Sequence, residues 1–141
     1  MVLYSECEKD TEEIGERLAR SLPEGGVVIA MYGDLGAGKT AFVRGMSRGL
    51  EVSGHVVSPT FTIVNEFYGK RDLFHFDMYR LGGADELFDI GWDDYLARGG
   101  VCAVEWSENV PEAFDGSEIR VTIEKLSDTR RKITVEGVDL C

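Results

Sequence analysis

The chain carries, at positions 33–40, a run of residues whose types and spacing suit the binding of phosphate groups. It reads Gly-Asp-Leu-Gly-Ala-Gly-Lys-Thr. Glycines allow the backbone to bend so that successive N–H groups point at one phosphate, at the N-terminus of the helix that follows. Lys39 adds a positive charge that can reach the β- and γ-phosphates, and the Thr40 hydroxyl can bind Mg²⁺. These residues therefore predict a site for a nucleoside triphosphate.

The segments on either side distinguish a phosphate-binding loop from a glycine-rich turn that only looks like one. Val27–Tyr32 is short, apolar and rich in β-branched residues, which is typical of a buried parallel strand. After the loop, Val43, Met46 and Leu50 recur at helical spacing, with two arginines outside that stripe. A strand, a phosphate-binding loop and a helix are thus expected in this order, and this context argues against the simple turn.

Two carboxylates at the ends of expected strands are candidates for the metal site. Glu105 follows the apolar residues 101–104, and Asp77 closes the segment Leu-Phe-His-Phe-Asp. Triphosphate chemistry needs a carboxylate near the phosphate loop to hold Mg²⁺, so we expect both acids to converge on the metal. The alternatives are that Asp77 only caps the next segment and that Glu105 is an ordinary surface acid. His75, on the same strand face as Asp77, is either a structural histidine or orients that carboxylate by a hydrogen bond.

Two further polar residues have less certain roles. Thr60 follows Pro59 and corresponds in position to the switch threonine that senses the γ-phosphate in phosphate-loop proteins. A simple turn before a strand is the alternative. Arg80 is expected to form an ion pair; the alternative is that it binds a phosphate.

The remaining segments indicate how the chain is organised. A helix is expected over residues 10–22, because Asp-Thr-Glu-Glu begins it like a cap and apolar residues recur at every fourth position up to Pro23. The other expected elements are a hairpin of residues 61–67 and 73–79, a helix over 84–96 interrupted at Gly91, a buried strand at 101–104, and an antiparallel hairpin of 119–125 and 131–136.

Composition is that of an ordinary soluble protein. The 141 residues, 43% hydrophobic and 29% charged, predict one domain, 1–141, and no apolar stretch approaches the roughly 20 residues of a membrane span. The N-terminus lacks the pattern of a secretion signal, so a cytoplasmic location is expected. Three widely spaced cysteines indicate neither a disulfide framework nor a zinc site.

The charge is strongly acidic. Lys and Arg total 15 against 26 Asp and Glu, which gives a net charge of −11. This disfavours direct binding of RNA or DNA, because nucleic acid is repelled at long range. Two interpretations stay open: the acidity only keeps the protein soluble, or an acidic face docks on a basic partner.

Taken in order, four motifs resemble the TsaE family, also called YjeE, the bacterial ATPase subunit of tRNA threonylcarbamoyladenosine modification. They are the phosphate loop at 33–40, Ser-Pro-Thr-Phe at 58–61, His-Phe-Asp-Met-Tyr-Arg at 75–80, and Glu-Trp at 105–106. The first motif alone is common to many ATPases, whereas the ordered set is specific. The resemblance spans residues 10–106, and the terminal hairpin matches less well. The chain departs from the family pattern at Ser107, where the family favours proline.

The resemblance implies a fold and an activity. The fold is a phosphate-loop α/β three-layer sandwich, with a mixed, mostly parallel sheet, helices on both faces and a C-terminal antiparallel hairpin. The activity is binding of ATP with Mg²⁺ and weak hydrolysis, in partnership with TsaD-like and TsaB-like subunits. ATP turnover would reset the complex between cycles of modification at adenosine 37, and tRNA would be contacted only indirectly. No membrane association is expected.

The resemblance also assigns roles to single residues. Lys39, Asp77 and Glu105 are the expected catalytic residues, and Thr40, Glu105 and Asp77 the expected metal ligands. At the first helix Thr11, and near the terminal hairpin Arg130 or Arg131, are expected to touch the adenine. The expected nucleotide-binding residues in full are Thr11, Gly33, Asp34, Leu35, Gly36, Ala37, Gly38, Lys39, Thr40, Ala41, Thr60 and Arg130.

Other classes of nucleotide-binding protein are alternatives. A regulatory GTPase normally carries an Asp-x-x-Gly switch and an Asn-Lys-x-Asp base reader, and neither occurs here. A small-molecule kinase needs an acceptor pocket and usually a lid, for which the chain leaves little length. A nucleotide-gated adaptor that binds ATP with negligible turnover could have the same sequence, so this class stays open.

Overall fold

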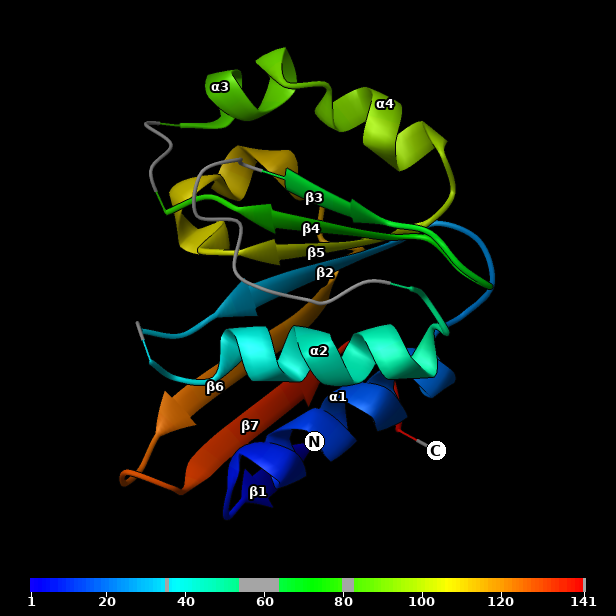
Figure 1. The fold of residues 1–141 in the computed structure, drawn as a ribbon. Coiled ribbons are helices and arrows are strands. Elements are labelled where there is room, and N and C mark those ends of the chain that lie inside the picture. The colour runs from blue at the N-terminus through cyan, green and yellow to red at the C-terminus, as the bar shows by residue number, and fades with distance from the viewer. Residues whose placement is uncertain (35, 54–63, 80–82, 141) are drawn as a thin grey trace.

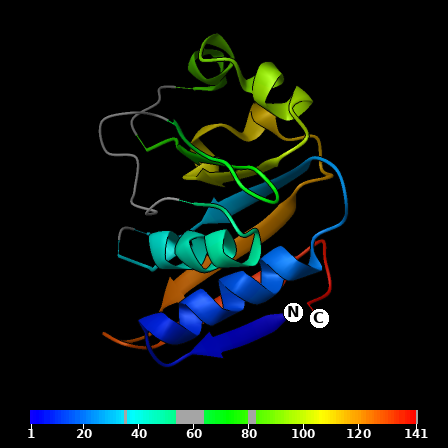
Figure 2. The ribbon, with the colours of Figure 1, turned by 45° about the vertical axis from the view of Figure 1, so that its right-hand side comes forward.

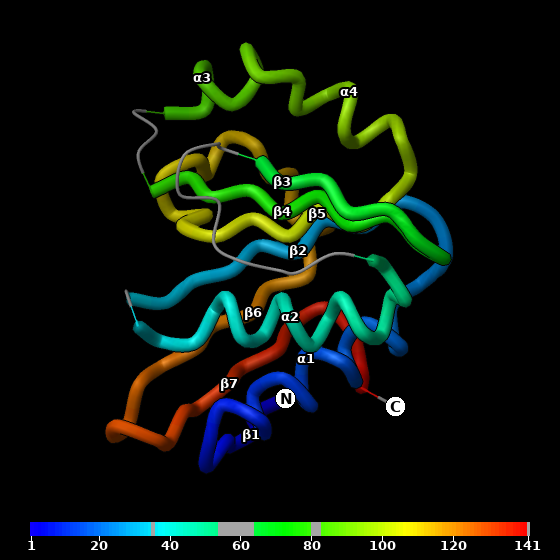
Figure 3. The backbone as a smooth tube through the Cα atoms, in the orientation of Figure 1, coloured from blue at the N-terminus to red at the C-terminus, as the bar shows by residue number. Residues whose placement is uncertain are grey.

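Seven strands form one sheet in the computed structural model, which describes residues 1–34, 36–53, 64–79 and 83–140 (Figure 1). Their spatial order is β1-β7-β6-β2-β5-β4-β3 (Figure 3). The elements in chain order are β1 (Val2–Ser5), α1 (Glu8–Ser21), β2 (Val27–Tyr32), α2 (Lys39–Gly49), β3 (Val64–Phe67), β4 (Leu73–Asp77), α3 (Ala84–Asp89), α4 (Trp92–Ala97), β5 (Val101–Glu105), two 3-10 turns (Ser107–Asn109 and Pro111–Ala113), β6 (Ile119–Lys125) and β7 (Arg131–Glu136).

Strand direction divides the sheet into a centre and two edges. The central strands β6, β2, β5 and β4 are parallel neighbours. At one edge β4 pairs with β3 in antiparallel fashion, and at the other β6 pairs with β7 and β7 with β1 (Figure 2). The expected mixed sheet and C-terminal hairpin are confirmed. Because parallel strands end at the same edge, the carboxyl ends of β2, β4 and β5 lie together.

Helices α1 and α2 lie side by side on one face of the sheet (Figure 1). The expected α2 stripe of Val43, Met46 and Leu50 is buried, and it shares a core with Ile29 and Met31 of β2. The helix backbones touch, since a Cβ atom on Gly45 would lie 1.8 Å from the carbonyl oxygen of Glu12. This tight contact holds α2, the helix that follows the glycine-rich loop, against α1.

Helices α3 and α4 cover the other face over β4 and β5. Phe74 and Phe76 of β4 point to this side, and Phe76 packs edge-on against Trp92 of α4 with ring centroids 5.2 Å apart. Because side chains alternate along a strand, His75 and Asp77 point to the α2 side. None of the helices in the described ranges combines the length and apolar character needed to cross a bilayer.

Several boundaries differ from expectation. Helix α1 begins at Glu8, so the segment Asp-Thr-Glu-Glu that was expected to cap it lies inside the helix. Strand β4 ends at Asp77, two residues earlier than expected. Strand β1 was not expected, because four residues at the chain terminus carry little periodicity of their own. Gly91 does interrupt the helical segment, in a left-handed conformation with φ of 100°.

Candidate functional site

The loop between β2 and α2 contains glycines in the backbone conformation that the predicted phosphate-binding loop requires. Gly36 and Gly38 have φ of 77° and 107°, a left-handed conformation that residues with a side chain rarely adopt. The N–H of Ala37 donates to the carbonyl oxygen of Asp34 at 3.1 Å, which turns the chain inside the loop. Helix α2 then begins at Lys39. The free N–H groups at a helix N-terminus attract anions.

Lys39 keeps its ammonium group inside the protein, with 5% of the residue exposed. Its Nζ donates to the carbonyl oxygen of Gly33 at 2.6 Å and lies 3.7 Å from the ring centroid of Trp106. Burial lowers the pKa of Lys39, and the negative charge of Glu105 acts in the opposite direction. The ammonium thus lies beside the loop, next to the Gly33 carbonyl and under the Trp106 ring.

The two expected carboxylates lie next to each other. Asp77 and Glu105 are paired residues in the β4–β5 register, at the carboxyl ends of both strands. Asp77 accepts a hydrogen bond from the N–H of Tyr79 at 3.0 Å, so the capping role considered for it is real. Glu105 is only 4% exposed, which contradicts the alternative of an ordinary surface acid.

The carboxylate that His75 contacts is Glu105. One of the two roles considered for His75 was to orient Asp77, its neighbour on β4; instead its Nε2 forms a hydrogen bond with Oε2 of Glu105 on β5. Both side chains are buried, and Nδ1 of His75 has no partner among the described residues. The contact arises because β4 and β5 bring their same-face residues together across the sheet.

A cavity of about 660 Å³ joins the loop to these acids, a volume in the usual range for small-molecule sites. Four elements line it: the loop and the start of α2, the ends of β4 and β5, the start of α1, and the turn between β6 and β7. The lining residues are Cys7, Glu8, Thr11, Gly36, Ala37, Gly38, Lys39, Thr40, Ala41, Arg44, Asp77, Tyr79, Glu105, Trp106, Asp128, Thr129 and Arg131.

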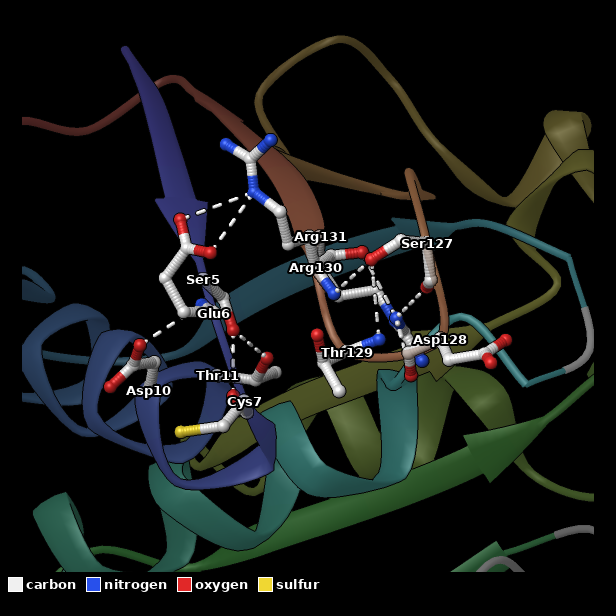
Figure 4. Close-up of polar contacts among 10 residues, drawn as sticks. All are labelled: Ser5, Glu6, Cys7, Asp10, Thr11, Ser127, Asp128, Thr129, Arg130 and Arg131. Atoms are coloured by element: carbon white, nitrogen blue, oxygen red, sulfur yellow. Dashed lines mark hydrogen bonds and ion pairs between the residues drawn. The ribbon is translucent and has the colours of Figure 1, made fainter.

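Figure 4 shows the side of the cavity formed by α1 and the β6–β7 turn. The hydroxyl of Thr11 shares a buried hydrogen bond of 2.7 Å with that of Ser5, which also donates to the carbonyl oxygen of Cys7 at 2.7 Å. Arg130 forms an ion pair with Glu6 at 3.0 Å. These contacts fasten β1, the start of α1 and the turn to one another at the mouth of the cavity.

The oxygen ligands present fit Mg²⁺ of the kind found in phosphate-transfer sites. Within the described ranges no three His, Cys, Asp or Glu side chains gather as a ready-made metal cage. Mg²⁺ at such sites is usually held by one or two protein groups together with phosphate oxygens and waters. Thr40, Asp77 and Glu105 all line the same cavity and can supply that smaller set.

The structure brings most of the predicted residues together. Ten of the residues assigned to binding or chemistry line the cavity: Thr11, Gly36, Ala37, Gly38, Lys39, Thr40, Ala41, Asp77, Glu105 and Arg131. Gly33 and Asp34 contact lining residues: the Gly33 carbonyl accepts a hydrogen bond from Lys39, and the Asp34 carbonyl accepts one from the N–H of Ala37. Arg130 turns to Glu6, while Arg131 lies at the cavity. Leu35, Thr60 and Arg80 lie outside the described residues, so their roles stay predictions.

Trp106 is the residue that sequence reasoning undervalued. Its ring covers the Lys39 ammonium and packs at 4.9 Å against the ring of Tyr79, which also lines the cavity. Its backbone is left-handed, with φ of 58°, an uncommon conformation for a bulky residue. An aromatic residue directly after the strand-end Glu105 was the available signal, although nothing in the sequence placed it over Lys39.

Comparisons with known proteins bear on these features. The family model described as "Threonylcarbamoyl adenosine biosynthesis protein TsaE" matches residues 5–133. The chain is 38% identical over 135 residues to the tRNA threonylcarbamoyladenosine biosynthesis protein TsaE of Treponema pallidum, a match that covers 96% of this chain and 99% of the relative. The chain belongs to the TsaE family.

Further TsaE relatives and a solved structure agree with this assignment. TsaE of Bacillus subtilis is 39% identical over 123 residues, covering 86% of this chain and 77% of that protein. The crystal structure of Bacillus subtilis YdiB matches with a TM-score of 0.81 and 30% identity, over 100% of this chain and 86% of the other. The expected family and fold class are confirmed.

Ser107, which was expected to depart from the TsaE pattern, has a structural use. The residue is fully buried. Its Oγ accepts a hydrogen bond from the N–H of Met31 at 3.2 Å and donates one to the carbonyl oxygen of Val104 at 2.7 Å. The side chain therefore ties the ends of β2 and β5 together beneath the site. A proline could not make these contacts.

Proposed function

We propose that this TsaE-family chain binds ATP with Mg²⁺, hydrolyses it, and acts in the biosynthesis of threonylcarbamoyladenosine in tRNA. The matched family model and the relatives carry that biosynthesis in their names. The observation that carries the catalytic part is one cavity in which the phosphate loop, Lys39, Thr40 and two adjacent strand-end carboxylates meet.

The residues of the cavity divide the chemistry among them. Loop N–H groups and Lys39 bind and orient the phosphates, because phosphoryl transfer depends on positioning and on charge stabilisation. Thr40 and Glu105 would hold the metal, and Asp77 would assist in positioning the metal and its water. Bound Mg²⁺ would neutralise charge on the phosphate oxygens. The Trp106 ring shields Lys39 from water, which strengthens its electrostatic interaction with a phosphate.

The proposal includes partner subunits of the TsaD-like and TsaB-like kinds, with ATP turnover resetting their complex between cycles. The net charge of −11 supports an indirect relation to tRNA, because a strongly acidic chain gains little from contact with a polyanion. RNA contact is then left to the partners, and the acidic surface is available to a basic protein face.

Single-turnover hydrolysis of ATP tests this function directly. The purified chain is mixed with radiolabelled ATP and Mg²⁺, alone and with purified TsaB and TsaD, and phosphate release is followed. We expect slow release from the chain alone and faster release with partners. Tight ATP binding with no release under either condition would support the nucleotide-gated adaptor instead. A pull-down in ATP that recovers neither partner would contradict the assembly.

A further inference from the structure

The guanidinium of Arg131 contacts backbone carbonyl groups on two different segments. Its Nε donates to the carbonyl oxygen of Ala37 at 2.8 Å, and Nη2 to that of Gly36 at 3.2 Å. On its other side, Nη1 donates to the carbonyl oxygens of Ser127 at 2.8 Å and Arg130 at 3.0 Å. One side chain therefore bridges the phosphate loop and the β6–β7 turn.

The sheet determines where Arg131 sits. It is the first residue of β7, paired with Lys125 of β6 on one side and with Ser5 of β1 on the other. Ser5 in turn is bonded to Thr11 at the start of α1. Figure 4 shows Arg131 beside Ser127 and Asp128, across the cavity mouth from Thr11 and Cys7. The base of the Arg131 side chain is thus fixed by strands on both sides.

These contacts orient the peptide groups of the loop. In a trans peptide the carbonyl and the next N–H point in opposite directions. The Gly36 carbonyl held by Arg131 turns the N–H of Ala37 away, and that N–H meets Asp34. The Ala37 carbonyl held by Arg131 likewise turns the N–H of Gly38 away from the arginine. Gly38 lines the cavity in which we place the phosphates.

We propose that Arg131 is a positioning residue for the phosphate loop. Its planar fork holds two loop carbonyls outward and couples the loop to the β6–β7 turn, which lines the same cavity. This role differs from the adenine contact that the family resemblance implied for this part of the hairpin. The proposal rests on the proposed nucleotide-binding function for its consequence, whereas the effect on loop structure does not depend on any ligand.

Hydrogen exchange of the ligand-free protein tests the loop directly. The variants are Arg131→Met, which removes the donors, and Arg131→Lys, which keeps the charge but not the fork. Arg71→Met is the matched control, because Arg71 also donates to two backbone carbonyls, those of Pro23 and Gly25, at the amino end of β2. The amides of β2 and β5 report whether each variant is folded.

We expect exchange in residues 36–40 to accelerate about tenfold or more in Arg131→Met, since hydrogen bonds from a charged donor are lost. Arg131→Lys should fall between this variant and the wild type, and Arg71→Met should leave these amides unchanged. Wild-type exchange in the loop of Arg131→Met would overturn the proposal. Wild-type protection of the loop in Arg131→Lys would also overturn it, because a positive charge without the planar guanidinium would then be enough to hold the loop.

Calorimetry with inorganic tripolyphosphate and with ATP separates loop positioning from a base contact. If Arg131 positions the loop, Arg131→Met should lose about tenfold in affinity for both ligands. Loss for ATP with tripolyphosphate unaffected would place Arg131 on the base or ribose and overturn the proposal. A wild-type protein that binds neither ligand would refute the proposed function, and the exchange experiment would still decide the role of Arg131.

Discussion

Lys39 carries a positive charge in an almost fully buried position, with a carbonyl oxygen and an aromatic ring as its contacts. Removing an ammonium group from water is unfavourable, which is why burial lowers the pKa of this lysine. A polyanion in the cavity would stabilise the charged form. A phosphate bound in the cavity would therefore gain a strong electrostatic interaction with Lys39.

Replacing Lys39 by alanine should abolish ATP binding, with a loss in affinity of at least about a hundredfold, because phosphate charge in the loop would stay uncompensated. Titration calorimetry in Mg²⁺ measures this loss. The variant should stay folded, since the change removes a buried charge. Unchanged affinity in a folded variant would refute the assignment of the loop.

Glu105→Gln should weaken Mg²⁺-dependent hydrolysis more than metal-free nucleotide binding. The amide keeps the size of the side chain and a hydrogen bond to His75, but it lacks the negative charge that a metal needs. Single-turnover rates in Mg²⁺ are compared with calorimetric affinities in EDTA. Equal losses in the two assays would count against a metal role.

The sequence was sufficient to identify the candidate functional residues, but not the residues that they contact. A phosphate loop can be identified from local sequence, because all its parts lie within eight positions. The partner of His75 could not, since contact with Glu105 depends on the β4–β5 register. Trp106 over Lys39 is the same kind of case, because it depends on a left-handed backbone turn after β5.

At the scale of elements, the contact between α1 and α2 sets the position of the loop helix. Glycines permit the approach at three positions: Gly45 faces the backbone of Glu12, Gly15 faces that of Phe42, where a Cβ would lie 2.1 Å from the carbonyl oxygen, and Gly49 faces that of Glu16, where a Cβ would lie 2.8 Å from the carbonyl oxygen. Arg44 and Arg48 then reach across to Glu8 and Glu12 at 2.8 and 2.6 Å. Those exposed pairs add little stability, so close packing must hold the helices.

Gly45→Ala should lower the free energy of unfolding by about 3 kcal/mol, because the added methyl group would collide with the backbone of Glu12 and force the helices apart. Urea denaturation followed by circular dichroism measures the change. Gly83→Ala is the control, since a Cβ there meets no atom of the described residues within 4 Å. A loss for Gly45→Ala no larger than that of the control would contradict this account.

Local periodicity was sufficient for β2 and α2, whose apolar residues are buried as expected. It was insufficient for β1, because Val2–Ser5 becomes a strand only through pairing with β7 at the other end of the chain. The start of α1 was misplaced for a related reason. The segment Asp-Thr-Glu-Glu, expected to begin the helix, lies inside it, and the hydroxyl of Thr11 is hydrogen-bonded to that of Ser5 at the end of that strand.

At the scale of the whole molecule, the sheet places β5 in its interior, between β2 and β4. Cys102, on β5, is 1% exposed, whereas Cys7 at the cavity mouth is exposed. Burial raises the pKa of the Cys102 thiol to about 12. Thiolate is the reactive form, so Cys102 is inert as long as the sheet stays closed.

Alkylation of Cys102 should therefore report global unfolding. A rise in pKa from 9.0 to about 12 reduces the thiolate population about a thousandfold at pH 8, and burial also excludes the reagent. We expect Cys7 to be alkylated in the native protein and Cys102 only in denaturant, as followed by peptide mass spectrometry. Rapid native labelling of Cys102 would indicate that β5 opens on its own.

The position of β2 between β5 and β6 has a consequence for biosynthesis of the protein itself. On the ribosome, the apolar β2 emerges long before either neighbour, and β1 emerges before β7. The nascent chain therefore exposes an unpaired hydrophobic strand during most of its translation, a stage at which chaperones act. The loop can reach its final form only after Arg131 has been translated.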